Sequence, residues 1–142
     1  MRNKFDEQLL ELNQEMTKMG NMIEESIAKA VEALYKRDND LAKQIMESDT
    51  KIDRAQKKIE DICFNLLIQQ QPVARDLRNI TAAMKMVTDM ERIGDHAADI
   101  SEMSLYIGEG RDLPKFEHIN QMASETVMML NWSIEAYVSK DL

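Results

Sequence analysis

Five carboxylates in two stretches of the chain have a spacing that could hold a cation. Glu91, Asp95 and Asp99 recur at every fourth residue of a strongly helical segment, so their side chains project from one side of that helix. Asp49 and Asp53 form a second pair with the same spacing. Carboxylate oxygens are the ligands that magnesium, manganese, calcium and iron prefer. The alternative is a solvated acidic stripe, because acidic rows are common on exposed helix faces.

The two acidic pairs are predicted to lie at one level of two neighbouring antiparallel helices. Asp49 lies 22 residues (71 − 49) before the turn at Gln71. Ile93, between Glu91 and Asp95, lies 22 residues (93 − 71) after it. The rise per residue of a helix is constant, so both pairs fall at the same distance from the turn. This counting predicts the position of each pair along the helix axis, but not the direction in which its side chains point. The cation site and the solvated acidic stripe therefore both remain possible interpretations.

Other residues that could do chemistry are isolated. The Glu-x-x-His pairs of the di-iron bundle enzymes do not occur in the sequence. His96 and His118 are predicted to be surface residues, and Cys63 is predicted to be a small buried apolar residue rather than a reactive thiol. The sequence has no nucleophile paired with a base and no phosphate-binding glycine loop. The chain is therefore not expected to be an enzyme. A metal-dependent hydrolase would also need a substrate cleft, and nothing indicates one.

The composition predicts an all-α protein. The 142 residues include only 4 Gly and 2 Pro, together with 12 Met, which is typical of long helices with few interruptions. The net charge of −8 argues against nucleic acid as a partner, because phosphate binding needs clustered Lys and Arg. The single cysteine excludes an internal disulfide, and no apolar run is long enough to cross a bilayer. We expect a cytoplasmic protein without direct membrane insertion.

Apolar residues at alternating spacings of three and four positions give each helix a seam that can face a core. This pattern predicts helices over residues 3–37, 40–70, 73–107 and 114–137. Residues that favour turns separate them, namely Asp38-Asn39-Asp40, Gln71-Pro72 and Gly108-Glu109-Gly110.

The third predicted helix differs from the others because it is apolar on two faces. The first stripe consists of Leu77, Ile80, Met84, Val87, Glu91, Gly94, Ala98, Ser101 and Leu105. Within this stripe, Glu91 occupies a position where an apolar residue is expected. The second stripe consists of Ala83, Met86, Met90, Ile93, Ala97 and Ile100. Such a helix is expected to pack between two layers or at a subunit interface. Gly94 either lets a neighbouring helix approach closely or is a tolerated helix glycine.

The fourth predicted helix resembles the first. Val31-Glu32-Ala33 aligns with Ile134-Glu135-Ala136 at an offset of 103 residues (134 − 31), and Arg37-Asp38 aligns with Lys140-Asp141. This indicates the start of a second copy of a three-helix unit. We therefore predict an antiparallel three-helix bundle over residues 1–108, a linker over 109–113, and the first helix of a second, truncated bundle repeat over 114–142. One helix cannot bury its own apolar face, so the chain is expected to be a fragment or to pack this helix on another subunit.

Three stretches of the sequence resemble the PhoU family of phosphate-signalling regulators. They are residues 91–97 (ERIGDHA), the turn at residues 70–78 (QQPVARDLR) and residues 41–53 (LAKQIMESDTKID). The resemblance covers essentially the whole chain. It implies two tandem three-helix bundles, in agreement with the repeat, and this chain lacks the last two helices of the second copy.

The resemblance implies a negative regulator of phosphate uptake and phosphate-starvation signalling. Such proteins link the ATPase of the phosphate ABC transporter to a sensor histidine kinase, and a homo-oligomer is expected, as a dimer or a helix-swapped form. Family members bind metals through acidic pairs of the form Glu/Asp-x-x-x-Asp. The residues here that fit this form, and are the implied metal ligands, are Asp49, Asp53, Glu91, Asp95 and Asp99. The implied cofactors are iron, zinc, manganese or magnesium. The alternative is a metal-free helical-bundle interaction module with an acidic docking face.

Overall fold

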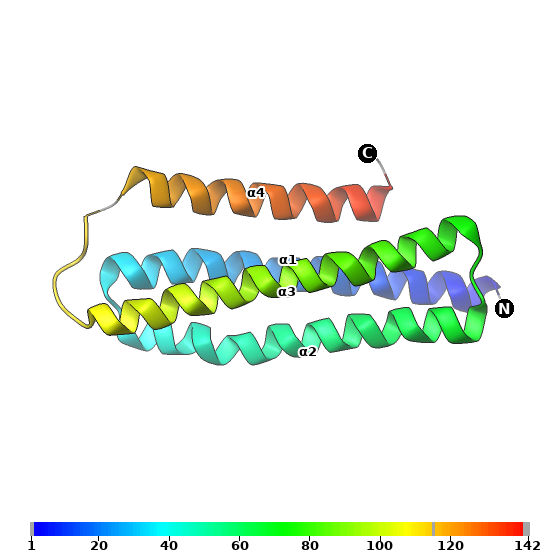
Figure 1. Cartoon of the computed structure of the whole chain (residues 1–142), viewed down its shortest axis with the longest axis horizontal. Coiled ribbons are helices and arrows are strands. Elements are labelled where there is room, and N and C mark those ends of the chain that lie inside the picture. Colours follow the sequence, from blue (N-terminus) through cyan, green and yellow to red (C-terminus); the bar gives the residue numbers. More distant parts are fainter. Residues whose placement is uncertain (1, 115, 141–142) are drawn as a thin grey trace.

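The computed structural model of the chain describes residues 2–114 and 116–140, and four long helices make up almost all of that part. They are α1 (Arg2–Lys36), α2 (Asn39–Gln70), α3 (Ala74–Ile107) and α4 (Glu117–Ser139). The first three form an antiparallel bundle, and α4 runs alongside it (Figure 1). The all-α prediction and the predicted three-helix bundle are confirmed. Met1, Lys115, Asp141 and Leu142, which fall within the predicted domain ranges, lie outside the described residues.

The predicted seams of the first three helices line one continuous core. Leu12, Met16, Met19 and Ile23 of α1 have no exposed surface. They pack in one apolar cluster with residues from the other two helices, namely Ile45, Ile52, Ile59 and Leu66 of α2 and Ile80, Ala83, Val87, Met90 and Ala97 of α3. The members from α3 come from both of its predicted stripes, because α3 packs against α1 and α2 together.

Two residues of the predicted stripes of α3 are exposed instead of buried. Leu77 is exposed because it lies in the first turn of α3, where the bundle ends. Ile100 is exposed because it lies at the edge of the second stripe, and about 50° separates it from the stripe's centre at 100° per residue.

Asp38, the first residue of the predicted turn, caps the start of α2. Asp38 has an extended backbone and its carboxylate accepts a hydrogen bond from the backbone N–H of Leu41 at 3.0 Å. Such an N-cap satisfies one of the unpaired donors at a helix start. Arg37, just before it, has a φ of +52°, which closes α1 and reverses the chain. The short turn makes α1 and α2 antiparallel neighbours.

Side chains at the end of α1 hold the segment that connects α3 to α4. The Arg37 guanidinium donates hydrogen bonds to the carbonyls of Ile107 and Gly108, both at 2.9 Å, at the end of α3. The Tyr35 hydroxyl donates to the Phe116 carbonyl at 2.9 Å and accepts from the Phe116 N–H at 3.1 Å. The Tyr35 carbonyl accepts from the N–H of Leu113 at 2.7 Å.

These bonds correct the predicted start of the fourth helix. The helix begins at Glu117 and not at Pro114. Phe116, its N-cap, has an extended backbone with φ −87° and ψ 118°, and Tyr35 holds both its N–H and its carbonyl. The fixed φ of Pro114 is compatible with a helix start and does not require one.

Replacing Tyr35 with Phe is expected to loosen this connection without unfolding the bundle. The variant loses two hydrogen bonds to Phe116. At about 1 kcal/mol per bond, the free energy of unfolding should fall by about 1–2 kcal/mol. Trypsin should cleave faster after Arg111, an exposed residue of the connection. Tyr106→Phe, which changes an exposed tyrosine of α3, is the control. Equal cleavage rates in the two variants would contradict the prediction.

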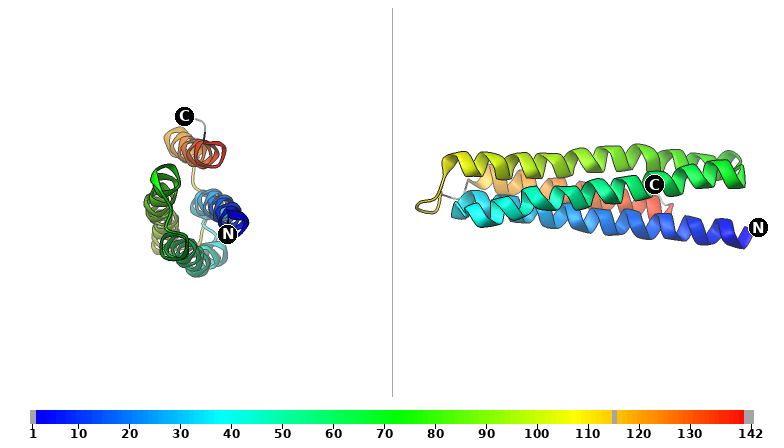
Figure 2. Two further views of the ribbon diagram at one scale, coloured as in Figure 1. Left: turned by 90° about the vertical axis from the view of Figure 1, so that its right-hand side faces the viewer. Right: turned by 90° about the horizontal axis from the view of Figure 1, so that it is seen from below.

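Helix α4 packs mainly on α1, on the opposite side of the bundle from α2 (Figure 2). Leu130 and Ile134 are buried on its inner face. A Cβ atom at Gly20 of α1 would overlap the Ile134 side chain, so the glycine allows this close approach. The outer face of α4 is also apolar, with Met122, Met128, Met129 and Trp132 all exposed. Within the described residues, no helix combines the length and the apolar character that a membrane crossing requires.

Candidate metal centre

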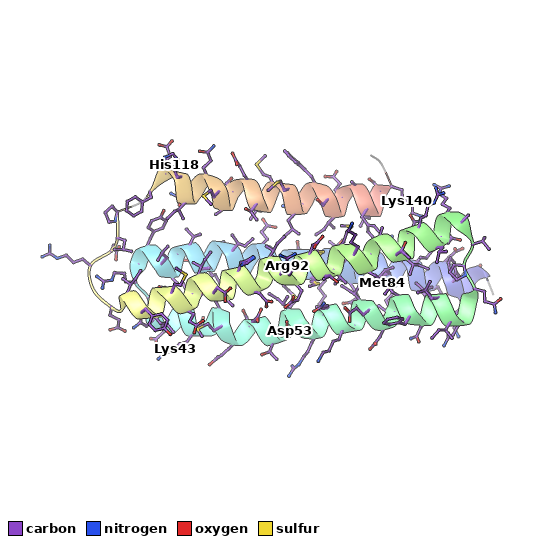
Figure 3. All side chains as sticks on the ribbon, viewed as in Figure 1. Lys43, Asp53, Met84, Arg92, His118 and Lys140 are labelled. Atoms are coloured by element: carbon purple, nitrogen blue, oxygen red, sulfur yellow. The ribbon has the colours of Figure 1, made fainter. Side chains whose placement is uncertain are left out.

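Three of the five predicted ligands meet between α2 and α3. Asp49 and Asp53 of α2 and Asp95 of α3 each contribute a carboxylate oxygen, and these three oxygens lie within 4.8 Å of one another. The site lies near the middle of the bundle's length, where Figure 3 labels Asp53 on α2 and Arg92 on α3 at the same level. Equal distances from the turn predicted this shared level.

Glu91 adjoins the three aspartates. Burial is the largest cause of a pKa raised to about 7, and the neighbouring carboxyl groups of Asp95 and Asp53 raise it further. Glu91 therefore carries a proton below about pH 7 when nothing else neutralises the site.

Asp49 has one carboxylate oxygen that is shielded from water. Its Oδ1 atom is buried and has no hydrogen-bond partner. Burial is the main cause of its raised pKa, about 6, and the charges of Asp95 and Asp53 add to it. A buried carboxylate oxygen without a partner costs free energy unless a proton or a cation neutralises it.

Asp99, the fifth predicted ligand, lies apart from this group. Its carboxylate is exposed, and its Oδ2 atom is 3.8 Å from Nδ1 of His96, which is also exposed. Its only effect on the group is through its negative charge, which is the smallest of the five causes that raise the pKa of Asp49. Residues i and i+8 of a helix are about 12 Å apart along the axis, so Asp99 and Glu91 cannot share one small ion.

Gly94 sets how close the two acidic helices come. A Cβ atom at this position would lie 3.2 Å from Cδ1 and Cγ2 of Ile52 and 3.8 Å from Cγ1 of Ile23. Glycine therefore lets the backbone of α3 pack on these two side chains. Of the two roles considered for Gly94, the structure supports close approach. The adjacent Asp95 is thereby brought within reach of the α2 carboxylates.

The donor set suits a hard cation. Four clustered carboxyl groups, with no imidazole or thiolate among them, match magnesium, manganese, calcium or iron better than a tightly bound structural zinc. The orphaned Oδ1 of Asp49 is a ligand atom already turned away from water. A divalent ion would replace the proton on Glu91 and cancel the repulsion among the four groups. Asp49, Asp53 and Asp95 are therefore the residues that could hold it, and Glu91 lies beside them.

Without a metal, the free energy of unfolding should fall as the pH rises from 4 to 7. Both Asp49 and Glu91 have higher pKa values in the folded protein than the ordinary 3.8 and 4.5 expected after unfolding. The folded state thus binds more protons in this window, and stability decreases with pH. We expect a loss of about 2 kcal/mol between pH 5 and pH 7.5 in EDTA, measured by urea unfolding. Glu91→Gln should flatten this dependence. An equally steep fall in that variant would contradict it.

A basic groove on the other side of α2 was not predicted from the sequence. Lys51, Arg54 and Lys58 line it at spacings of three and four residues. This spacing places them on one face of a helix, and it was the feature of the sequence from which a basic surface could have been predicted. Basic residues on a helix usually face solvent, so the spacing alone did not single them out.

The fold agrees with comparisons to known proteins. The family model described as PhoU domain matches residues 16–104. A "Phosphate-specific transport system accessory protein PhoU homolog" from Clostridium acetobutylicum is 39% identical over 99% of this chain and 65% of its own length. The homolog from Streptococcus pneumoniae serotype 4 is 38% identical over 92% of this chain and 60% of its own length.

Two solved structures have the same fold. The crystal structure of PhoU from Pseudomonas aeruginosa matches with a TM-score of 0.87 and 30% identity, over 96% of this chain and 66% of that one. The phosphate transport system regulatory protein PhoU from Streptococcus pneumoniae matches with a TM-score of 0.81 and 32% identity, over 93% and 62%. The chain thus spans between 60% and 66% of the length of these four proteins. Its sequence motifs, its helical bundle and the match over residues 16–104 establish that the chain belongs to the PhoU family.

Proposed function

We propose that the chain is an accessory regulator of a phosphate-specific transport system and binds a divalent or iron cation between α2 and α3. Family membership and the printed names of its relatives support the transport role. The cation half depends on one observation. Asp49 buries an unpartnered carboxylate oxygen beside the oxygens of Asp53 and Asp95. The site is proposed to be regulatory and not catalytic.

The more detailed role that we propose is the one implied by the resemblance to the family. We propose that the protein restrains phosphate uptake and the phosphate-starvation response, as an adaptor between the transporter's ATPase and a sensor histidine kinase. The acidic group would stiffen the α2–α3 pair when loaded, which gives the adaptor a cation-dependent form. A homo-oligomer, as a dimer or a helix-swapped form, remains part of this proposal.

The predicted division of the chain also remains a proposal. Residues 1–108 are assigned to the first bundle, 109–113 to the linker, and 114–142 to the first helix of a second repeat. The exposed apolar outer face of α4 supports the last assignment, because such a face is suited to further packing.

Elemental analysis with calorimetric titration tests the cation half. Protein stripped with EDTA should bind manganese or iron(II) saturably, and an Asp49→Asn/Glu91→Gln/Asp95→Asn variant should not. Asp61→Asn, an exposed aspartate of α2, is the control. If iron, manganese, magnesium and zinc all fail to bind the wild-type protein, the metal-free docking module becomes the better interpretation.

A reporter of the phosphate-starvation response tests the regulatory half. In a bacterium that lacks its own family member, this chain should restore repression when phosphate is plentiful. The triple variant should fail to restore it at the same protein level. Repression by neither protein would contradict the regulatory role of this chain while leaving the titration result intact.

A further inference from the structure

A groove of about 540 Å³ runs along the surface between α1 and α2. Its floor is mainly apolar and consists of Met22, Ile45, Ile52 and Ala55, together with the hydroxyl side chains of Ser26 and Ser48. No residue of α3 or α4 lines it, so it lies on a side of the bundle formed by α1 and α2 alone. Its α1 border extends from Glu15 to Lys29, which is about 21 Å at the rise of a helix. That length corresponds to roughly four turns of a docked helix.

The rim of the groove carries the opposite charge from the rest of the chain. It has five basic side chains, Lys18, Lys29, Lys51, Arg54 and Lys58, and only two acidic ones, Glu15 and Glu25. The whole chain has 18 basic and 26 acidic residues. The groove is therefore a positive strip of net charge +3 on a protein of net charge −8.

Three of the five cations are available to a ligand. Lys29 pairs with Glu25 at 2.6 Å, and Lys58 pairs with Glu15 at 2.9 Å. The other three are Lys18, Lys51 and Arg54. None of them forms an ion pair within the part of the chain that the structure describes. They come from both helices, so they border the apolar floor on two sides.

We propose that this groove docks an acidic amphipathic helix of a partner protein. The helix would place its apolar side on Met22, Ile45 and Ala55 and its carboxylates beside Lys18, Lys51 and Arg54. A hydrophobic floor between charged rims is the arrangement by which helices are recognised in grooves. The proposal goes beyond the proposed function, and it does not depend on the acidic group between α2 and α3.

Two other occupants fit less well. A bare polyanion would use the cations but leave the apolar floor uncovered. A second copy of this chain could offer the outer face of α4, which combines Met128, Met129 and Trp132 with Glu125. Such a contact joins two different surfaces, however, so it closes only where the symmetry between the copies lets both grooves be filled.

The test uses the full chain and a designed peptide. A fluorescein-labelled helix of about 16 residues, with Leu and Met along one face and Glu elsewhere, is titrated by fluorescence anisotropy. We expect saturable binding that weakens by roughly tenfold between 20 and 200 mM salt. Lys51→Glu/Arg54→Glu should weaken binding by a further factor of about ten or more. Lys43→Glu/Lys57→Glu makes the same charge change outside the groove on α2 and should change the Kd by less than about threefold.

Four outcomes would overturn the proposal. One is that the wild-type chain does not bind the peptide. Another is equal weakening by the two variants, since that reports net charge and not the groove. Undiminished binding of a peptide with Ser in place of Leu and Met would indicate a polyanion site. Sedimentation showing that the chain self-associates, and that Lys51→Glu/Arg54→Glu abolishes this, would assign the groove to a second copy. Unchanged cation titration and circular dichroism confirm that each variant is folded with its acidic group intact.

Discussion

Asp95→Asn is expected to abolish cation binding and, at the same time, to stabilise the metal-free protein. Asp95 contributes an oxygen to the three-aspartate group, so its loss removes a charged ligand. Beside the larger effect of burial, the negative charge of Asp95 raises the pKa values of both Glu91 and Asp49. Replacing it with the isosteric amide relieves that repulsion. We expect the free energy of unfolding at pH 7.5 in EDTA to rise by about 1–2 kcal/mol.

Thermal unfolding with and without manganese measures both effects. At about 100 times its Kd, the ion should stabilise the wild-type protein by about 2.7 kcal/mol, which raises Tm by about 10 °C. The variant should show a higher Tm in EDTA and no response to manganese. Asp89→Asn, an exposed site on the same helix, should leave both quantities unchanged. A lower Tm in EDTA for Asp95→Asn would show that the carboxylate is a structural partner and not a source of repulsion.

Asp99→Asn separates the fifth predicted ligand from the other four. Asp99 is exposed and lies beside His96, so we expect this variant to bind manganese like the wild-type protein. A Kd weakened more than about tenfold would place Asp99 in the coordination sphere.

Gly94→Leu is expected to destabilise the bundle strongly. Even a Cβ atom would lie 3.2 Å from two carbons of Ile52, a side chain with only 1% of its surface exposed. A leucine must therefore push α3 away from α1 and α2. Overpacking of this kind costs about 3 kcal/mol or more. The separation also moves Asp95 away from Asp49 and Asp53, so the response to manganese should disappear.

Two controls give this prediction its specificity. Gly94→Ala should change stability little, because the gain of about 1 kcal/mol in helix propensity offsets a small shift of Ile52. Ala82→Leu adds the same side chain at an exposed position of α3 and should be nearly neutral. Urea unfolding gives all three free energies. Gly94→Leu with wild-type stability and wild-type cation binding would mean that the close approach of α3 is not needed.

The position of the acidic group along the bundle could be predicted from the sequence. Which of the five carboxylates belong to it could not. Helix rise is fixed, so counting from Gln71 brought Asp49 and Asp53 to the level of Asp95. Rotation about the helix axis depends on which side chains interlock, and here the contact of Gly94 with Ile52 decides it. Asp99 fits the same four-residue spacing. One turn beyond Asp49, however, α2 carries the buried Ile45, so no acidic partner faces Asp99.

Other features could be predicted where they depend on residues close in the sequence, and could not where they depend on residues far apart. The cap at Asp38 was predictable because its hydrogen bond joins residues three apart. The start of α4 was not, because Tyr35 lies 81 residues away from Phe116. Cys63 was predicted to be a buried apolar residue, and the structure confirms it, with burial raising the pKa of its thiol to about 11. The basic groove needed both α1 and α2 in place before its charge became apparent.

The anchoring of the connection by Tyr35 and Arg37 sets how fast α4 could exchange between two molecules. Swapping requires the hinge to open, and here the hinge is tied to α1 by three hydrogen bonds from Tyr35 and further ones from Arg37. Leu130 and Ile134 must also leave α1. These contacts are lost when the hinge opens, so they add to the activation barrier. A swapped form would therefore appear slowly, and Tyr35→Phe would speed its appearance.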